Sequence, residues 1–100
     1  MSDPMSLAHI RSRIDALDAD LVRLLADRQE LVRMAATHKT DEHAVRAPAR
    51  VEAVVALARE RAAAAGLAPA VAESVWRAMI GAFIELELAE QAAIRDRVGS

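Results

Sequence analysis

Two basic residues occupy positions on one helical face where the pattern predicts hydrophobic residues. Apolar residues recur every three or four positions in the first third of the chain, and continuing this series past Leu24 reaches Arg28. A guanidinium in a core-facing position needs an anionic partner. Lys39 follows eleven residues later, and eleven residues of α-helix return to within about 20° of the same face. Arg28 and Lys39 are therefore candidates to bind one anion, although Arg28 could also reach solvent or pair with a carboxylate of the third helix, and Lys39 could be a solvated helix end.

A carboxylate ends an apolar stripe in the last third of the chain. Trp76, Ile80 and Phe83 precede Glu87 at spacings of four, three and four residues, which places them all on one helical face. We therefore expect Glu87 to be partly buried. A buried carboxylate needs a cation or hydrogen-bond donors nearby, so Glu87 is a candidate catalytic residue.

Arg50 and Arg11 are two further candidates for binding an anion. Arg50 lies on the first turn of the second predicted helix, and a purely structural interpretation has Glu87 pair with Arg50 or Arg28. Arg11 lies seventeen residues before Arg28, about 25 Å along a helix, so the two cannot contact one small ligand within a single chain. In an antiparallel dimer, however, the start of one long helix lies near the middle of the other.

No residues in the sequence have the spacing of a metal or cofactor site. The three histidines, His9, His38 and His43, are not spaced as metal ligands, and the absence of cysteine excludes disulfides, thiolate metal sites and cysteine nucleophiles. The sequence also contains neither a glycine-rich phosphate-binding loop nor a Ser-His-Asp arrangement. We therefore expect no metal and no cofactor.

The composition is that of a single helical domain. The chain has 100 residues, of which 54% are hydrophobic, with 2% aromatic residues and only three glycines and three prolines. These values favour an all-α fold with one core and one domain over residues 1–100. The net charge of -2 argues against a nucleic-acid partner. The sequence shows no membrane-spanning segment and no signal peptide, so we expect a cytoplasmic protein.

The first predicted helix is too long for a compact monomer. It begins after Ser6, a favourable N-cap, and continues without glycine or proline to Lys39, about 33 residues and roughly 50 Å. A compact domain of 100 residues has a radius of gyration of about 13 Å, so the apolar face of such a helix would extend into water. We therefore expect a partner chain to cover this face in a helical homodimer.

Prolines and a glycine delimit two further helices. Pro48 stands in the first turn of a second helix, which continues through Ala49–Ala65 and stops at Gly66. Pro69 opens a third helix, which ends near Arg97. The remaining segments, expected to form a loop and two frayed ends, are 40–47, 1–5 and 98–100.

The charged residues stand in contexts that resemble one enzyme family. Arg11 lies in Ile-Arg-x-x-Ile-Asp-x-Leu-Asp, and Arg28 ends Leu-Leu-Ala-Asp-Arg. Together with a lysine that closes the first helix, an arginine that opens the second and an acid on the third, these motifs resemble the AroQ-type chorismate mutases over Leu7–Gln91. In this chain the lysine is Lys39, the arginine is Arg50 and the acid is Glu87.

The resemblance implies an intertwined homodimer with two active sites, each built from both chains. In such a site Arg28 and the Arg11 of the second chain hold the two carboxylates of the substrate, and Arg50 helps to hold the substrate near the loop. Lys39 and Glu87 hydrogen-bond the ether oxygen of the breaking bond. The implied reaction is the pericyclic rearrangement of chorismate to prephenate, catalysed by orientation and electrostatic stabilisation.

Three positions depart from the family pattern. Glu87 stands where glutamine is commonest, and a carboxylate donates a hydrogen bond only when protonated, so we expect activity to rise at lower pH and Glu87→Gln to be faster at neutral pH. Val51 stands where mutases often have a glutamate that contacts the ring hydroxyl of the substrate, and Ala47 stands where some mutases have aspartate. The loop that ends Arg-Ala-Pro-Ala-Arg-Val most resembles the isochorismate-pyruvate lyases.

These observations predict a chorismate mutase, with three alternatives. An isochorismate-pyruvate lyase shares the fold and would suit the loss of the hydroxyl contact at Val51. A mutase of 4-amino-4-deoxychorismate is the second alternative, and a non-catalytic helical dimerisation or regulatory module is the third. Under the last interpretation, Arg28, Lys39 and Glu87 would tolerate exchange for leucine, methionine or glutamine.

Overall fold

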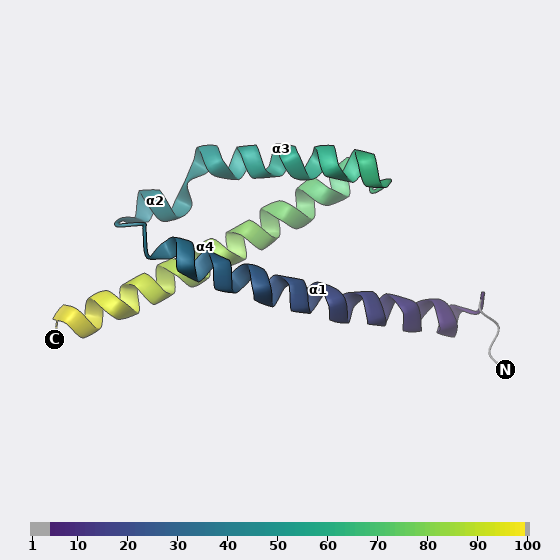
Figure 1. The fold of residues 1–100 in the computed structure, drawn as a ribbon, viewed down its shortest axis with the longest axis horizontal. Helices are drawn as coiled ribbons and strands as arrows, with labels where there is room; N and C mark the ends of the chain where they lie inside the picture. The colour runs from purple at the N-terminus through teal and green to yellow at the C-terminus, as the bar shows by residue number, and fades with distance from the viewer. Residues whose placement is uncertain (1–4, 100) are drawn as a thin grey trace. The chain divides into compact units, whose positions relative to one another are not determined.

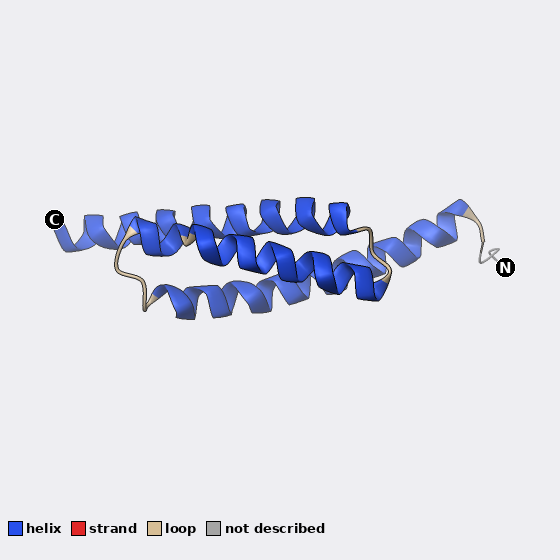
Figure 2. Cartoon of the chain, turned by 90° about the horizontal axis from the view of Figure 1, so that it is seen from above, coloured by secondary structure: helices blue, strands red, loops and turns tan. Residues whose placement is uncertain are grey.

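Helices make up the regular secondary structure of the chain. The computed structural model describes residues 5–99, and within this range it contains helices and no strand (Figures 1 and 2). The all-α prediction is confirmed, because three long helices are present, with a short one between the first and the second. The helices are α1 (Leu7–Ala36), α2 (Glu42–Arg46), α3 (Pro48–Ala65) and α4 (Pro69–Gly99).

α1 makes up most of the first of two compact units, residues 1–34 and 35–100. The helix begins as predicted, since the Ser6 hydroxyl accepts a hydrogen bond from the backbone N–H of His9 at 3.1 Å, as an N-cap does. Apolar residues alternate with charged ones along α1, and none of its residues is buried. α1 is therefore amphipathic rather than apolar throughout.

The end of α1 differs from the prediction. The helix stops at Ala36, so the expectation that it continues to Lys39 is wrong. The N–H of Lys39 bonds the carbonyl oxygen of Ala36 at 3.1 Å, and His38 makes the same type of contact one residue earlier at 3.0 Å. Such three-residue turns are tighter than an α-helix and mark its unwinding. Asp41, two residues after Lys39, is the N-cap of the next helix.

The segment expected to be a loop, residues 40–47, contains α2. Asp41 is the N-cap of this helix and accepts a hydrogen bond from the N–H of Ala44 at 2.8 Å. Val45 is only 3% exposed, and α2 packs against α4. The prediction missed α2 because one turn is too short to show a period. An aspartate followed directly by Glu42 is the local signal that could have found it.

Ala47 joins α2 to α3 in a left-handed conformation. Its φ and ψ angles are 36° and 62°, and its N–H bonds the carbonyl oxygen of His43 at 2.9 Å. This conformation costs a residue that carries a Cβ roughly 1–2 kcal/mol relative to the right-handed one. Pro48 then begins α3 as predicted, because its fixed φ suits the first turn of a helix. The strained residue thus lies between Lys39 and Arg50 in the chain.

α3 and α4 form a hairpin with small buried residues. Gly66, with a φ of 81°, ends α3 as predicted, and the N–H of Leu67 bonds the carbonyl oxygen of Ala62 at 2.8 Å. Small side chains let two helices approach closely, and α3 packs against α4. The buried hydrophobic residues of the two helices are Val55, Ala58, Ala62, Ala72 and Ile80.

α4 ends later than predicted. It spans 31 residues and includes Val98 and Gly99, where a frayed end was expected. Of the other residues expected to fray, Met5 forms a turn, and residues 1–4 and 100 lie outside the described part of the chain. No helix within residues 5–99 is both long and apolar enough to cross a membrane.

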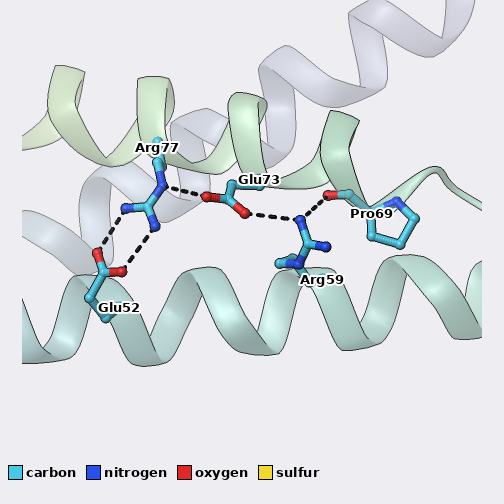
Figure 3. Close-up of polar contacts among 5 residues, drawn as sticks. All are labelled: Glu52, Arg59, Pro69, Glu73 and Arg77. Carbon is cyan, nitrogen blue, oxygen red and sulfur yellow. Dashed lines mark hydrogen bonds and ion pairs between the residues drawn. The ribbon is translucent and has the colours of Figure 1, made fainter.

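Four charged side chains connect α3 to α4 along the hairpin (Figure 3). Arg77 donates hydrogen bonds to the two carboxylate oxygens of Glu52 at 2.8 and 2.9 Å, and a third to Glu73 at 2.9 Å. Arg59 donates to Glu73 at 2.9 Å and to the carbonyl oxygen of Pro69 at 3.4 Å. The hydrogen bonds from Arg77 hold the pKa of both carboxyl groups below its ordinary value, and the carboxylates raise the pKa of Arg77.

Candidate active site

A buried ion pair connects the segment after α1 to α4. The Nζ atom of Lys39 lies 3.2 Å from one carboxylate oxygen of Glu87 and 3.3 Å from the other. Glu87 is 6% exposed and is the one buried charged residue in the part of the chain whose burial is described. The side chain of Lys39 is 26% exposed. The carboxylate side chain is therefore enclosed, whereas the lysine side chain is partly exposed.

The register of α4 places Glu87 among apolar residues. Ile80, two turns earlier, is buried, and Trp76 and Phe83 are half-buried, so the burial expected for this face is confirmed. An ionised carboxylate in such surroundings loses hydration and needs a cation or several donors in return. Lys39 provides this compensation in the structure.

The pairing of Lys39 with Glu87 did not follow from helical spacing. The prediction that Arg28 and Lys39 lie on one helical face required an unbroken helix between them. Because α1 ends three residues before Lys39, this prediction is wrong. The chain is instead turned toward α4 by α2, whose Val45 is buried. Sequence reasoning considered Arg28 or Arg50 as the partner of Glu87, and the structure shows Lys39 in contact with it.

Arg50 lies on the first turn of α3, where it was predicted, and it is exposed. The next residue, Val51, is half-buried. The left-handed Ala47, three residues before Arg50, sets the direction in which α3 begins. The position of the Arg50 backbone thus depends on a conformation that helical periodicity does not predict.

Arg11 and Arg28 belong to α1, in the unit formed by residues 1–34. Arg11 is exposed and Arg28 is partly exposed. Because α1 is unbroken between them, their separation of seventeen residues corresponds to about 25 Å. The two arginines of one chain therefore cannot hold the same small ligand.

The ion pair has the chemistry of a site that donates hydrogen bonds. An ammonium group carries three donors, whereas an ionised carboxylate only accepts. An ammonium held in a partly enclosed place stabilises negative charge that develops on a bound molecule. Within residues 5–99, no cluster of three or more histidine, aspartate or glutamate side chains is arranged to hold a metal ion.

Comparison with known proteins finds one family and one partial relative. Residues 10–88 match the sequence model of the family described as chorismate mutase type II. A stretch of 53 residues is 42% identical to an isochorismate pyruvate lyase of Pseudomonas aeruginosa, and it covers 53% of this chain and 52% of that protein. The match thus spans about half the length of this relative.

Proposed function

This chain belongs to the chorismate mutase type II family, and we propose that it is an enzyme that rearranges chorismate to prephenate. The matched range, residues 10–88, contains all five candidate site residues. The observation that carries the proposal is the buried contact of Lys39 with Glu87, because the rearrangement needs a hydrogen-bond donor held beside the breaking bond.

The rearrangement requires orientation and charge stabilisation but no covalent catalyst. As the C–O bond of the enolpyruvyl ether breaks and a C–C bond forms, negative charge develops on the ether oxygen. In our proposal the ammonium group of Lys39 donates a hydrogen bond to this oxygen. A charged hydrogen bond of this kind contributes about 1.5–3 kcal/mol, which corresponds to roughly 10- to 150-fold in rate.

We assign the binding of the substrate to three arginines, two of which hold its carboxylates. Arg28 of one chain and Arg11 of a second chain hold the two carboxylates, since the arginines of a single chain lie too far apart, and Arg50 holds the substrate near α2. This arrangement requires a homodimer. Apolar residues along α1 provide a surface for a second copy, among them Leu17 and Leu24, which are 62% and 64% exposed.

The second candidate is isochorismate-pyruvate lyase activity. The 42% identity over 53 residues with a lyase favours it. Val51, in place of the acid often found in mutases, also suits a substrate whose hydroxyl group lies on a different ring carbon. Both reactions are pericyclic and use the same contacts to carboxylates and to the ether oxygen, so the pair of Lys39 and Glu87 supports either one.

The purified protein, offered chorismate and isochorismate separately, tests both candidates. Prephenate formed from chorismate supports the first proposal, and salicylate with pyruvate formed from isochorismate supports the second. A folded protein that converts neither of them, nor 4-amino-4-deoxychorismate, would contradict an enzymatic function and favour a dimerisation module. Lys39→Met is the control, because turnover by contaminating enzymes would persist in this variant.

A further inference from the structure

α2 is too short to be a stable helix by itself. It has five residues, Glu42–Arg46, and isolated helices shorter than about 12–15 residues are marginal in water. Its stability must therefore come from contacts beyond its own backbone hydrogen bonds. These contacts are the cap at Asp41, an exposed ion pair of Arg46 with Glu42 at 2.9 Å, and the packing of α2 against α4.

Val45 is the main anchor of α2. It is the one buried residue of this helix and is 3% exposed. Exposed ion pairs contribute little to stability, whereas the burial of a valine side chain is a larger favourable contribution. Because α2 packs against α4, the burial of Val45 ties α2 to the helix that carries Glu87.

Lys39 is joined to α2 by a very short stretch of chain. One residue, Thr40, separates it from the N-cap Asp41, so the Cα atoms of Lys39 and Asp41 are within about 8 Å of each other. On its other side, the N–H of Lys39 bonds the carbonyl oxygen of Ala36 at 3.1 Å. The backbone of Lys39 is thus held between α1 and α2, and its Nζ atom lies 3.2 Å from the carboxylate of Glu87.

We propose that Val45 is a positioning residue, which anchors α2 to α4 and thereby holds Lys39 beside Glu87 in the arrangement that the reaction needs. The inference rests on the proposed function. Val45 acts through Lys39, whose side chain has four rotatable bonds. Fixing the lysine backbone before the substrate binds lowers the entropic cost of bringing the ammonium group to the ether oxygen.

Val45→Ala tests this role, with Val55→Ala as the matched control. Both valines are 3% exposed, and each substitution removes the same two methyl groups from a buried position. Val55 belongs to α3, so its truncation weakens the hairpin without releasing α2. We expect Val45→Ala to lower kcat about 10-fold with KM nearly unchanged, the scale of loss for a misplaced catalytic group, and Val55→Ala to keep the wild-type kcat.

Two replacements of Asp41 test the same role from the other end of α2. Asp41 is exposed, so its replacement leaves the buried residues unchanged, and the comparison still decides if Val45→Ala does not fold. Serine is as good an N-cap as aspartate, whereas alanine is a poor one, and neither carries a charge. We expect Asp41→Ala to lower kcat several-fold and Asp41→Ser to stay within about twofold of the wild type.

A further measurement follows the ion pair without using activity. Urea unfolding of Lys39→Gln, Glu87→Gln and the double variant gives the coupling between the two side chains. We expect this coupling to be weaker when the cycle is repeated in Val45→Ala and unchanged when it is repeated in Val55→Ala. Equal coupling in both backgrounds would overturn the inference.

The outcomes separate the inference from the proposed function. Equal kcat values for Val45→Ala and Val55→Ala, both measured while fully folded, would overturn the inference and leave the proposed function standing. A loss of kcat in Asp41→Ser as large as that in Asp41→Ala would do the same. A wild type that converts none of the proposed substrates would overturn the proposed function and the catalytic role of Val45, whereas the unfolding cycle would still test whether Val45 holds the ion pair together.

Discussion

Lys39 and Glu87 are 48 positions apart in the chain, and their side chains form an ion pair that ties the connection between α1 and α2 to α4. The two partners are unequal, because the side chain of Glu87 is enclosed and that of Lys39 is partly exposed. Removing one partner therefore has a different consequence from removing the other.

We predict that Lys39→Met lowers the free energy of unfolding by about 3 kcal/mol, because it leaves a buried carboxylate without its cation. Glu87→Gln should cost about 1 kcal/mol or less, since the lysine side chain that remains is already partly exposed to water. Urea denaturation of both variants at neutral pH measures the difference. A larger loss for Glu87→Gln would contradict the predicted order.

The ion pairs between α3 and α4 predict a loss of stability in acid. Hydrogen bonds from Arg77 place the pKa of Glu52 and Glu73 below the ordinary value of 4.5 in the folded chain. A group whose pKa is lower in the folded state stabilises that state above its unfolded pKa, and the contribution disappears as the pH falls through the folded pKa. We therefore expect the free energy of unfolding to decrease as the pH falls below 4.5.

Arg77→Gln should weaken this dependence on pH, because the two carboxyl groups then titrate closer to their unfolded values. Arg61→Gln is the matched control, since Arg61 is an exposed arginine of α3 outside the group of ion pairs in Figure 3. The measurement is urea denaturation over a series of acidic pH values. If Arg77→Gln and Arg61→Gln show the same acid dependence, the ion pairs do not cause it.

Two alanine-to-glycine exchanges should have opposite effects on stability. Ala47→Gly relieves the left-handed strain, and after the entropic cost of a glycine we expect a gain of about 0.5 kcal/mol. Ala53→Gly, at an exposed position inside α3, should instead cost about 1 kcal/mol. Thermal unfolding of the two variants compares them directly. Equal destabilisation by both would argue against the left-handed conformation of Ala47.

The assembly prediction concerns the apolar residues of α1. If a second copy covers them, the protein is a dimer at micromolar concentrations, and light scattering should give twice the mass of the chain. Leu17→Glu and Leu24→Glu together should reduce the dimer population, because each places a charge in the covered surface. A folded monomer as the wild-type species would contradict both the dimer and a site shared between chains.

Mixing two damaged proteins tests whether Arg11 and Arg28 serve one site from different chains. Arg11→Ala and Arg28→Ala should each lose about 2 kcal/mol of transition-state binding, or about 30-fold in kcat/KM. Random exchange of subunits would restore one intact site in each mixed dimer, so about a quarter of the wild-type activity should return. No recovery despite confirmed exchange would mean that the two arginines do not meet across the dimer.

Several features of the fold follow from short stretches of sequence. Ser6 starts α1, Pro48 begins α3 and Gly66 ends it, and each acts through hydrogen bonds or backbone angles within a few residues. The burial of Glu87 also follows from its neighbours, because a period of 3.6 residues places it on the face of Trp76 and Phe83. These features are determined locally, so the sequence by itself predicts them.

The partner of Glu87 was decided by the tertiary structure. Lys39 reaches it because α1 stops early, a single turn of helix is capped by Asp41, and Val45 of that turn is buried in the contact of α2 with α4. None of these three features produces a periodic pattern in the sequence. The left-handed backbone conformation of Ala47 is also not one that alanine favours. The helices follow from neighbours in the chain, whereas the ion pair depends on packing between segments 48 residues apart.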